Sequence, residues 1–296
     1  MSLYPADGIF VCPICRAPLG RSDGSLVCPN RHAYDIAKSG YVNLLRESAG
    51  RHGDGKEMVA ARSAFLEKGY YAPLQKALTE LVEQMLRQMP DGPDDQTAGR
   101  PSGNRPAILL DSGCGEGYYT GALAENSALR VYGVDISARA AARAARRKGV
   151  CGVAVASAYD LPAATESCDV VTNLFSPFCR EEFYRVLKKK GRLINVVPGP
   201  RHLFELKEIL YDSPYEKPPA DSAVEGFSLL TGRNLSYTVT LPCREDIASL
   251  LQMTPYYYRT DKKGHARAEA LKTLTVRAEF TLLAYQKESE PSSSPR

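Results

Sequence analysis

Three glycines at alternate positions constrain the fold of this 296-residue chain more than any other feature. Gly113, Gly115 and Gly117 follow a short apolar run at residues 107–110. Glycine permits a sharp turn and a close approach of the backbone to a ligand, and a helix that begins there offers free N–H groups. The dinucleotide-binding fingerprint needs its third glycine where Tyr118 stands. The loop therefore predicts a strand, a turn and a helix that bind a ligand, and a nicotinamide-dependent fold is the less favoured alternative.

Acidic residues stand where predicted strands end. The pattern Asp-x-Gly-x-Gly-x-Gly is the form that class I methyltransferases use, and their cofactor is S-adenosylmethionine (SAM). Asp111 ends the strand before the loop, where a carboxylate can attract the ammonium group of the cofactor's methionine moiety. Asp135 ends the next strand and can accept hydrogen bonds from both ribose hydroxyls. Asp160, after the third strand, is a candidate contact for the adenine amino group or, alternatively, a helix or turn cap.

Short apolar runs alternate with helical segments after residue 106. The candidate strands are residues 107–110, 130–134, 152–156, 169–174 and 192–197. This alternation predicts an α/β fold with a parallel, doubly wound sheet. Two longer strand-like stretches, at 228–241 and 276–286, flank a helical segment at 244–252, so we expect an antiparallel hairpin at the sheet edge.

Cysteines cluster near the N-terminus. Of eight cysteines, Cys12, Cys15 and Cys28 lie close together with His32, in the pattern Cys-x2-Cys and Cys-x3-His, and the others are scattered singly. Two tight turns that each present two soft ligands complete the closed tetrahedral shell of a structural zinc ion. We therefore expect a non-catalytic zinc site, with a metal-free thiol cluster or a disulfide as the alternatives.

The chain divides by composition into four parts. Residues 1–45 are rich in turns and form the expected zinc ribbon, which is too small for a core of its own. Residues 46–106 form a helical connector with two helices around a turn at 69–71, followed by a Pro- and Gly-rich linker at 91–106. Residues 107–287 form the methyltransferase domain, and 288–296 form a Ser- and Pro-rich tail that we expect to be disordered.

The net charge of +4 is too small to indicate a nucleic-acid partner by itself. Basic residues gather at 139–148, 188–192 and 259–267, as RNA-binding patches or as ordinary solvated surfaces. No apolar run approaches the ~18 residues of a membrane helix, and residues 1–10 lack the features of a secretory signal. We expect a cytoplasmic protein with no membrane partner.

The segment 173–178, Asn-Leu-Phe-Ser-Pro-Phe, follows the fourth candidate strand. Class I enzymes that methylate planar nitrogens place substrate contacts there. Enzymes that act on amino groups usually have two prolines in this segment, and only Pro177 is present, so a ring nitrogen is as plausible a target. Phe175 and Phe178 can stack on a base turned out of its helix, although core packing is an equal alternative.

With these motifs in place, the chain closely resembles the bacterial 23S rRNA guanine-N1 methyltransferases, including the type associated with tylosin resistance. The likeness runs nearly end to end. It is carried by residues 12–15, 28–32, 40–45 (Gly-Tyr-Val-Asn-Leu-Leu), 57–62 (Glu-Met-Val-Ala-Ala-Arg), 111–120 and 198–203 (Pro-Gly-Pro-Arg-His-Leu). The segment 40–45 is the most distinctive.

The resemblance implies a zinc domain that grips an RNA hairpin, and methyl transfer from SAM to N1 of a guanine in a domain II hairpin of 23S rRNA. It also implies a larger set of cofactor contacts, namely Tyr71, Asp111, Tyr119, Thr120, Asp135 and His202. The linker is longer than family members usually have, and Tyr70 replaces a common histidine. Neither departure touches a motif residue.

The expected reaction is a direct displacement in which guanine N1 attacks the sulfonium methyl group. Positioning of the two reactants should supply much of the acceleration. N1 carries a proton at neutral pH, and no carboxylate or histidine is unambiguously placed to accept it. Two other functions are open, a small-molecule methyltransferase and a non-catalytic zinc RNA-binding protein. The modified guanine, macrolide resistance and a homodimer are not determined by the sequence.

Overall fold

The computed structural model describes residues 4–5, 8–46, 53–89, 105–219 and 221–289. Residues 91–104 of the expected linker and residues 290–296 of the expected tail lie outside these ranges. In the described part of the chain, no helix is both long enough and apolar enough to cross a membrane.

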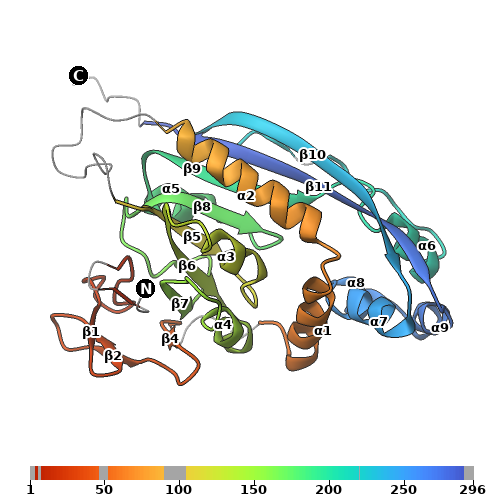
Figure 1. Ribbon diagram of the computed structural model, residues 1–296, viewed down its shortest axis with the longest axis horizontal. Coiled ribbons are helices and arrows are strands. Elements are labelled where there is room, and N and C mark those ends of the chain that lie inside the picture. The colour runs from red at the N-terminus through yellow and green to blue at the C-terminus, as the bar shows by residue number, and fades with distance from the viewer. Residues whose placement is uncertain (1–3, 6–7, 47–52, 90–104, 220, 290–296) are drawn as a thin grey trace.

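One large sheet dominates the molecule (Figure 1). Its strand order is β10-β11-β9-β8-β5-β6-β7-β4. The central strands are β5 (Ala107–Ser112), β6 (Leu129–Asp135), β7 (Gly152–Val155), β8 (Cys168–Leu174) and β9 (Leu187–Pro198). Adjacent members of this set run parallel, which confirms the predicted parallel sheet. Their carboxyl ends therefore meet along one edge, the edge where such folds bind ligands.

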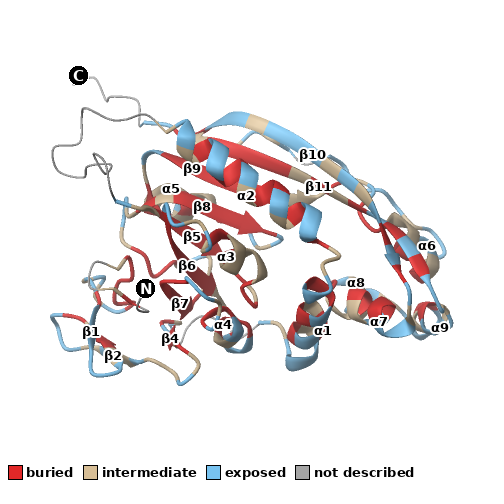
Figure 2. Cartoon of the chain, viewed as in Figure 1, coloured by how far each residue is buried: buried red, intermediate tan, exposed pale blue. Residues whose placement is uncertain are grey.

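The last two strands form the expected antiparallel hairpin. β10 (Phe227–Leu241) pairs antiparallel with β11 (Leu274–Lys287), and β11 also pairs antiparallel with β9. Figure 2 shows that the central strands are buried, whereas β10 is largely exposed along the outer edge. Both strands begin one or two residues before the predicted stretches, because hairpin hydrogen bonds continue past the apolar pattern.

Helices and the zinc ribbon cover the two faces of the sheet. The helices are α1 (Lys56–Glu67), α2 (Ala72–Arg87), α3 (Tyr118–Leu123), α4 (Ala138–Ala144), α5 (Arg180–Val186), α6 (Phe204–Leu210), α7 (Arg244–Gln252), α8 (Tyr256–Arg259) and α9 (Lys262–Glu269). α2 lies across one face, where Leu74 and Leu78 join the apolar side chains of β5, β6 and β8 in one core. α5 contributes Phe183 to a second core on the opposite face. Burial on both faces accounts for the continuous apolar runs of these strands.

The zinc ribbon shares the second core with the sheet. Its own three strands, β1 (Gly20–Ser22), β2 (Ser25–Val27) and β3 (Ala33–Asp35), form a small antiparallel sheet. Leu19, Leu26 and Phe10 belong to the second core, and the Phe10 ring lies 5.6 Å from the ring of Tyr132 on β6, edge to face. A small module without a core thus obtains one from its neighbour.

β4 (Tyr41–Asn43), from the segment 40–45, pairs parallel with β7 and extends the large sheet. Tyr4 secures the same edge, because its hydroxyl lies 2.8 Å from Gly40 O and 2.7 Å from Val153 O and shares its one proton between these carbonyls. The ribbon is therefore joined to the sheet by backbone pairing as well as by apolar packing.

Candidate active site and zinc centre

Cys12, Cys15, Cys28 and His32 converge as expected, with their ligand atoms all within 4.8 Å of one another. Cys12 Sγ and Cys28 Sγ each lie 3.4 Å from His32 Nδ1, and Cys15 Sγ lies 3.7 Å from Cys28 Sγ. Bond lengths of about 2.3 Å to sulfur and about 2.0 Å to nitrogen place two tetrahedral sulfur ligands roughly 3.8 Å apart and a sulfur and a nitrogen ligand roughly 3.5 Å apart. The donor set and its spacing therefore fit zinc, and the 3.7 Å sulfur separation excludes a Cys15–Cys28 disulfide in this structure.

Backbone turns hold the ligands in place. Arg16 N donates to Cys12 O at 2.8 Å, and Arg31 N donates to Cys28 O at 2.9 Å. Arg16 and Arg31 adopt left-handed backbone conformations, with φ of 59° and 63°. A hydrogen bond from the Ala17 amide lowers the pKa of Cys15 to about 7, which favours the thiolate that binds metal.

The glycine loop joins β5 to α3 as predicted, and the conformation explains each glycine. Gly113, Gly115 and Gly117 all have positive φ, at 80°, 55° and 80°. A Cβ on Gly113 would overlap the side chain of Ser176, and one on Gly117 would lie 2.7 Å from Ala144 Cα. Left-handed backbone and close neighbours together require glycine at the first and third positions.

Asp111 is buried at the end of β5. Its carboxylate accepts hydrogen bonds from Thr120 Oγ1 at 2.6 Å and from Thr172 Oγ1 at 2.8 Å. Burial raises the pKa of Asp111 to about 6, against the lowering effect of the two hydroxyls. Thr120, which the resemblance made a cofactor contact, thus orients the carboxylate, and each carboxylate oxygen keeps a lone pair for a further donor.

Asp135 connects the end of β6 to the glycine loop. Its carboxylate accepts hydrogen bonds from Gly115 N at 2.9 Å and from Ser137 N at 2.7 Å. Arg62 of α1 lies over the same loop, paired with Asp54 at 2.5 Å. Burial raises the pKa of Asp135, and Arg62 is among the groups that lower it. The acid expected at the ribose therefore also holds the loop in shape.

Unpartnered polar atoms gather at this edge of the sheet. Among the described residues, six buried side-chain N or O atoms have no hydrogen-bond partner. Four of these atoms are Ser112 Oγ, Glu116 Oε2, Tyr119 Oη and Asn173 Oδ1, all at the loop, the start of α3 or the end of β8. A buried polar group without a partner costs about 1–3 kcal/mol. Such unpartnered groups fit a site in which a polar ligand supplies the missing hydrogen bonds. A cofactor that contains an amino acid and a ribose is such a ligand.

Tyr71 and His202 meet across 131 positions of sequence. Tyr71 Oη lies 3.4 Å from His202 Nε2, and His202 Nδ1 accepts a hydrogen bond from Glu279 N at 3.2 Å. The proton of the neutral imidazole is therefore on Nε2. Burial lowers the pKa of His202 to about 3, so the ring is uncharged at neutral pH. Tyr71 lies near both His202 and Tyr119, and both tyrosines belong to the core on the face that carries α2.

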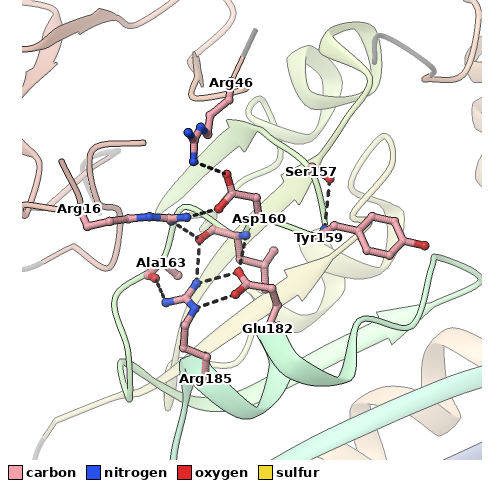
Figure 3. Close-up of polar contacts among 9 residues, drawn as sticks. Arg16, Arg46, Ser157, Tyr159, Asp160, Ala163, Glu182 and Arg185 are labelled. Atoms are coloured by element: carbon pink, nitrogen blue, oxygen red, sulfur yellow. Dashed lines mark hydrogen bonds and ion pairs between the residues drawn. The ribbon is translucent and has the colours of Figure 1, made fainter. Parts of the chain in front are cut away.

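Asp160 faces the zinc ribbon. Its carboxylate pairs with Arg16, and Arg46 Nη1 lies 3.8 Å from Asp160 Oδ2 (Figure 3). The Asp160 amide donates to Ser157 O at 3.1 Å, which closes a turn after β7. None of the described contacts of this carboxylate is to the glycine loop. The contact with adenine proposed from the sequence stays a prediction, and the structure adds an ion pair that no sequence pattern indicated.

The segment 173–178 lies against the glycine loop. Asn173 Nδ2 donates to Asn195 Oδ1 at 3.0 Å and to Ser176 O at 3.3 Å. Phe175 adopts a left-handed conformation, with φ of 56°, and its residue is 45% exposed. The Phe175 ring lies 5.6 Å from the ring of the buried Phe280, so it packs on the core and is also partly open to a ligand. A partly exposed aromatic residue in a strained conformation is a feature of binding sites.

Several basic residues of the expected patches have structural partners. Arg143 bonds to Ser63, and Arg147 donates to Glu67 Oε1 at 3.3 Å. Lys188 pairs with Asp169 at 2.8 Å, Arg192 donates to Gln286 Oε1 at 2.6 Å and Arg267 pairs with Asp212 at 2.8 Å. Much of this charge therefore stabilises the fold, as the alternative interpretation of the three clusters held.

Sequence reasoning missed four residues that shape the site, Arg62, Glu116, Thr172 and Asn195. Arg62 is the last residue of the family segment 57–62, and Glu116 lies within the glycine pattern. Both therefore belong to motifs that the sequence analysis identified, although it gave neither residue a role. Thr172 and Asn195 belong to strands with no motif. Only the register of β8 with β5 and β9 brings them to the site.

Two family models match the chain. Residues 10–46 match the zinc-ribbon family described as "RlmA, N-terminal", and residues 110–195 match the family described as "Methyltransferase domain". Together with the sheet and the Cys3His cluster, they confirm a class I methyltransferase fold with an N-terminal zinc ribbon, and SAM and zinc as its cofactors.

Three relatives resemble the chain. A Micromonospora griseorubida protein is 34% identical over 288 residues, which cover 93% of this chain and 96% of the relative. YxjB of Bacillus subtilis is 32% identical over the same shares. Both are named "Putative 23S rRNA (guanine-N(1)-)-methyltransferase". A Streptomyces fradiae protein, named 23S rRNA (guanine(748)-N(1))-methyltransferase, is 37% identical over 202 residues, or 67% of this chain and 66% of the relative.

Proposed function

The chain belongs to the 23S rRNA (guanine-N(1)-)-methyltransferase family, and from this premise we propose that it methylates N1 of one guanine in a domain II hairpin of 23S rRNA. The observation that carries the proposal is the near end-to-end similarity, which includes both the zinc ribbon and the SAM loop. A ribbon packed against the catalytic sheet suits a large substrate that needs a docking module.

The cofactor supplies an electrophilic methyl group on a sulfonium centre. Asp111 is proposed to hold the ammonium of the methionine moiety with the lone pairs that Thr120 and Thr172 leave free. Asp135 is proposed to accept the ribose hydroxyls, while Gly113, Gly115 and Gly117 allow the backbone to approach. The predicted contacts of Tyr71, Tyr119 and His202 are supported by the proximity of Tyr71 to the other two and by the unpartnered Tyr119 hydroxyl.

The guanine is proposed to stack on Phe175 beside Asn173. Asn173 Nδ2 donates to Asn195 Oδ1 and to the backbone carbonyl of Ser176. A carbonyl can only accept, so this contact fixes the orientation of the Asn173 amide and leaves Oδ1 as the free acceptor. The Watson–Crick edge of guanine offers N–H donors that match such an acceptor. Stacking on an aromatic ring contributes about 1–3 kcal/mol per base.

The proton on N1 must leave for transfer to proceed. His202 is a poor acceptor, because burial keeps its pKa near 3 and its Nδ1 is already occupied by the Glu279 amide. Asp111 is enclosed by two hydroxyls and is 2% exposed. Water at the open side of the site, where Phe175 is exposed, is therefore our proposed acceptor.

Transfer of labelled methyl groups from SAM to protein-free 23S rRNA tests the function. We expect label in the RNA and a new reverse-transcription stop at one guanine of domain II, because N1 methylation blocks base pairing. The Asp111→Ala variant should give neither. Label that moves to a small aromatic acceptor and never to rRNA would contradict the proposal.

The cytoplasmic location remains a prediction, and the sequence left a homodimer and macrolide resistance open. Cell fractionation, light scattering of the purified protein and growth on macrolides with and without the gene product test them separately.

A further inference from the structure

A network of charged side chains ties the turn after β7 to the zinc ribbon (Figure 3). Arg16 pairs with Asp160 through Nη2, and its Nη1 donates to Leu161 O at 3.2 Å. Arg46, which follows β4, lies 3.8 Å from the other carboxylate oxygen of Asp160. The side chains of Arg16 and Asp160 are 43% and 31% exposed, so water reaches the pair but does not surround it.

α5 holds the other side of the same turn. Glu182 accepts a hydrogen bond from Leu161 N at 2.6 Å, and Arg185 is bound to Glu182 through two nitrogens at 2.7 and 2.8 Å. Arg185 also donates to the carbonyls of Leu161 and Ala163 at 2.9 and 2.8 Å. α5 of the catalytic domain therefore anchors Leu161 and Ala163. The ribbon backbone also pairs with residues 162–164, and the ion pair with Arg16 extends the ribbon's contact to Asp160 in the turn itself.

The turn leads directly to the candidate cofactor site. Ala156 N donates to Asp135 O at 3.1 Å, so residues 157–160 begin next to the acid proposed for the ribose. They stand at the carboxyl end of β7, between the ribose acid and the ribbon. A displacement of Asp160 would therefore be passed to the wall of the cofactor site.

The turn formed by residues 12–16, which carries Cys12 and Cys15, sets the position of Arg16. Arg16 directly follows the ligand Cys15, and its φ of 59° belongs to a turn closed by the hydrogen bond from its amide to Cys12 O. A non-glycine residue in this conformation is strained and keeps it only while its surroundings hold it there. Cys12 and Cys15 are metal ligands in the confirmed zinc ribbon, so metal binding stabilises the turn that presents Arg16.

We propose that Arg16 is a positioning residue, which pairs with Asp160 to hold the 157–160 turn beside the cofactor and thereby links zinc occupancy to SAM affinity. The inference rests on the proposed cofactor site. It gives Asp160 an indirect part in cofactor binding, through the position of the turn, in place of the direct contact with adenine. Linkage is reciprocal, so SAM should tighten zinc binding by the factor by which zinc tightens SAM binding.

Calorimetric titration of SAM into the full-length, zinc-loaded protein tests the proposal. We expect Arg16→Ala and Asp160→Asn each to weaken SAM binding about fivefold, and the double variant to lose no more than either, because both break one pair. The charge-reversed double variant Arg16→Asp/Asp160→Arg should recover most of the loss. The effect should shrink as salt is raised, since the pair is partly exposed.

Arg31→Ala is the matched control. Arg31 has the same left-handed conformation in the second zinc turn, and it forms no ion pair within the described part of the chain. Its removal should leave SAM affinity unchanged. One equivalent of zinc and an unchanged Tm in every variant will show that the ribbon is intact.

Competition with a zinc chelator provides the second measurement. SAM should raise the zinc affinity of the wild-type protein about fivefold and that of Arg16→Ala not at all. If Arg16→Ala binds SAM as the wild type does while Asp160→Asn is weakened, Asp160 contacts the cofactor itself and the proposal is overturned. Equal SAM affinities in all variants would overturn it too. Failure of the wild type to bind SAM would refute the cofactor site as well, whereas binding without rRNA methylation would refute only the proposed substrate.

Discussion

Asp111 and His202 are both buried at the carboxyl edge of the sheet, and burial pushes each toward its uncharged form. The pKa of Asp111 is raised to about 6, and that of His202 is lowered to about 3. Neither group therefore adds to stability in its charged state. Sites that bind a charged ligand commonly keep such groups at the expense of stability.

We expect Asp111→Asn to stabilise the ligand-free protein at neutral pH. The folded-state pKa of Asp111 is above its ordinary 3.8, so the ionised carboxylate destabilises the fold increasingly as pH rises from about 4 to 6. An amide removes that effect, which is on the order of 3 kcal/mol at pH 7 and nearly absent at pH 3.5. Denaturant unfolding at both pH values measures it.

The same variant should bind SAM at least tenfold more weakly, because an amide cannot attract the ammonium group. The exposed Asp212, which pairs with Arg267, provides the control. Asp212→Asn should neither stabilise the protein at pH 7 nor weaken SAM binding. A variant that is destabilised at pH 7 would show that the carboxylate is a structural anchor.

Phe175 allows the substrate role to be separated from stability. Glycine tolerates the φ of 56° better than phenylalanine, and the ring is nearly half exposed. Phe175→Gly should therefore keep Tm within a few degrees and leave SAM affinity unchanged. We expect kcat/KM for rRNA to fall about tenfold or more, since stacking on one base contributes about 1–3 kcal/mol. Unchanged methylation of rRNA would remove Phe175 from the substrate site.

At the scale of elements, the glycine loop is a joint among β5, α3, α4 and the end of β8. Gly113 touches Ser176 after β8, and Gly117 lies against Ala144 at the end of α4. Gly115 has open space, with Arg62 Nη1 3.9 Å from the position of a Cβ. Three glycines with similar φ therefore face different steric limits.

Alanine substitutions should rank these glycines by damage. Gly115→Ala has no steric clash, so its only cost is that of a left-handed backbone, about 1–2 kcal/mol. At about 2–4 °C per kcal/mol, Tm should fall by several degrees. Gly117→Ala should lower Tm most, because it meets the α4 backbone. Gly113→Ala should be intermediate and partly rescued by Ser176→Gly, which leaves the nearest atom at 3.7 Å. Equal effects of all three would contradict this steric account.

At the scale of the whole molecule, the zinc ribbon replaces a helix layer over part of one face of the sheet. Phe10 and Leu26 share a core with Tyr132, and the backbone of residues 9–11 pairs with that of 162–164. The ribbon is therefore coupled to the sheet, although family patterns treat the two as separate units.

Removal of zinc should affect both parts. We expect chelation, or Cys12→Ser, to expose the amides of residues 10–35 to hydrogen exchange, since the binding energy of such sites is folding energy. Exchange should also rise in β6 and β7, where the ribbon packs, and Tm should fall. Cys243→Ser, at a cysteine outside the cluster, is the control. Faster exchange confined to the ribbon, with an unchanged Tm, would show that the ribbon folds on its own.

Local spacing was enough to predict much of this protein. The four residues of the Cys3His cluster, the glycine loop with Asp111 and Asp135, and the alternation of strands and helices were predicted from the sequence, and the fold and both cofactors are confirmed. These features are readable because each depends on residues a few positions apart, whose chemistry and backbone requirements are the same wherever they occur.

Tertiary packing decided the rest. The ribbon's place on the sheet, the Tyr71–His202 contact, the position of Arg62 over the loop and the Arg16–Asp160 pair join residues separated by tens to more than a hundred positions. No periodicity signals such contacts, because they follow from strand order and from the sharing of one apolar core. The glycine loop thus specified the kind of cofactor, and only the folded chain showed which distant side chains surround it.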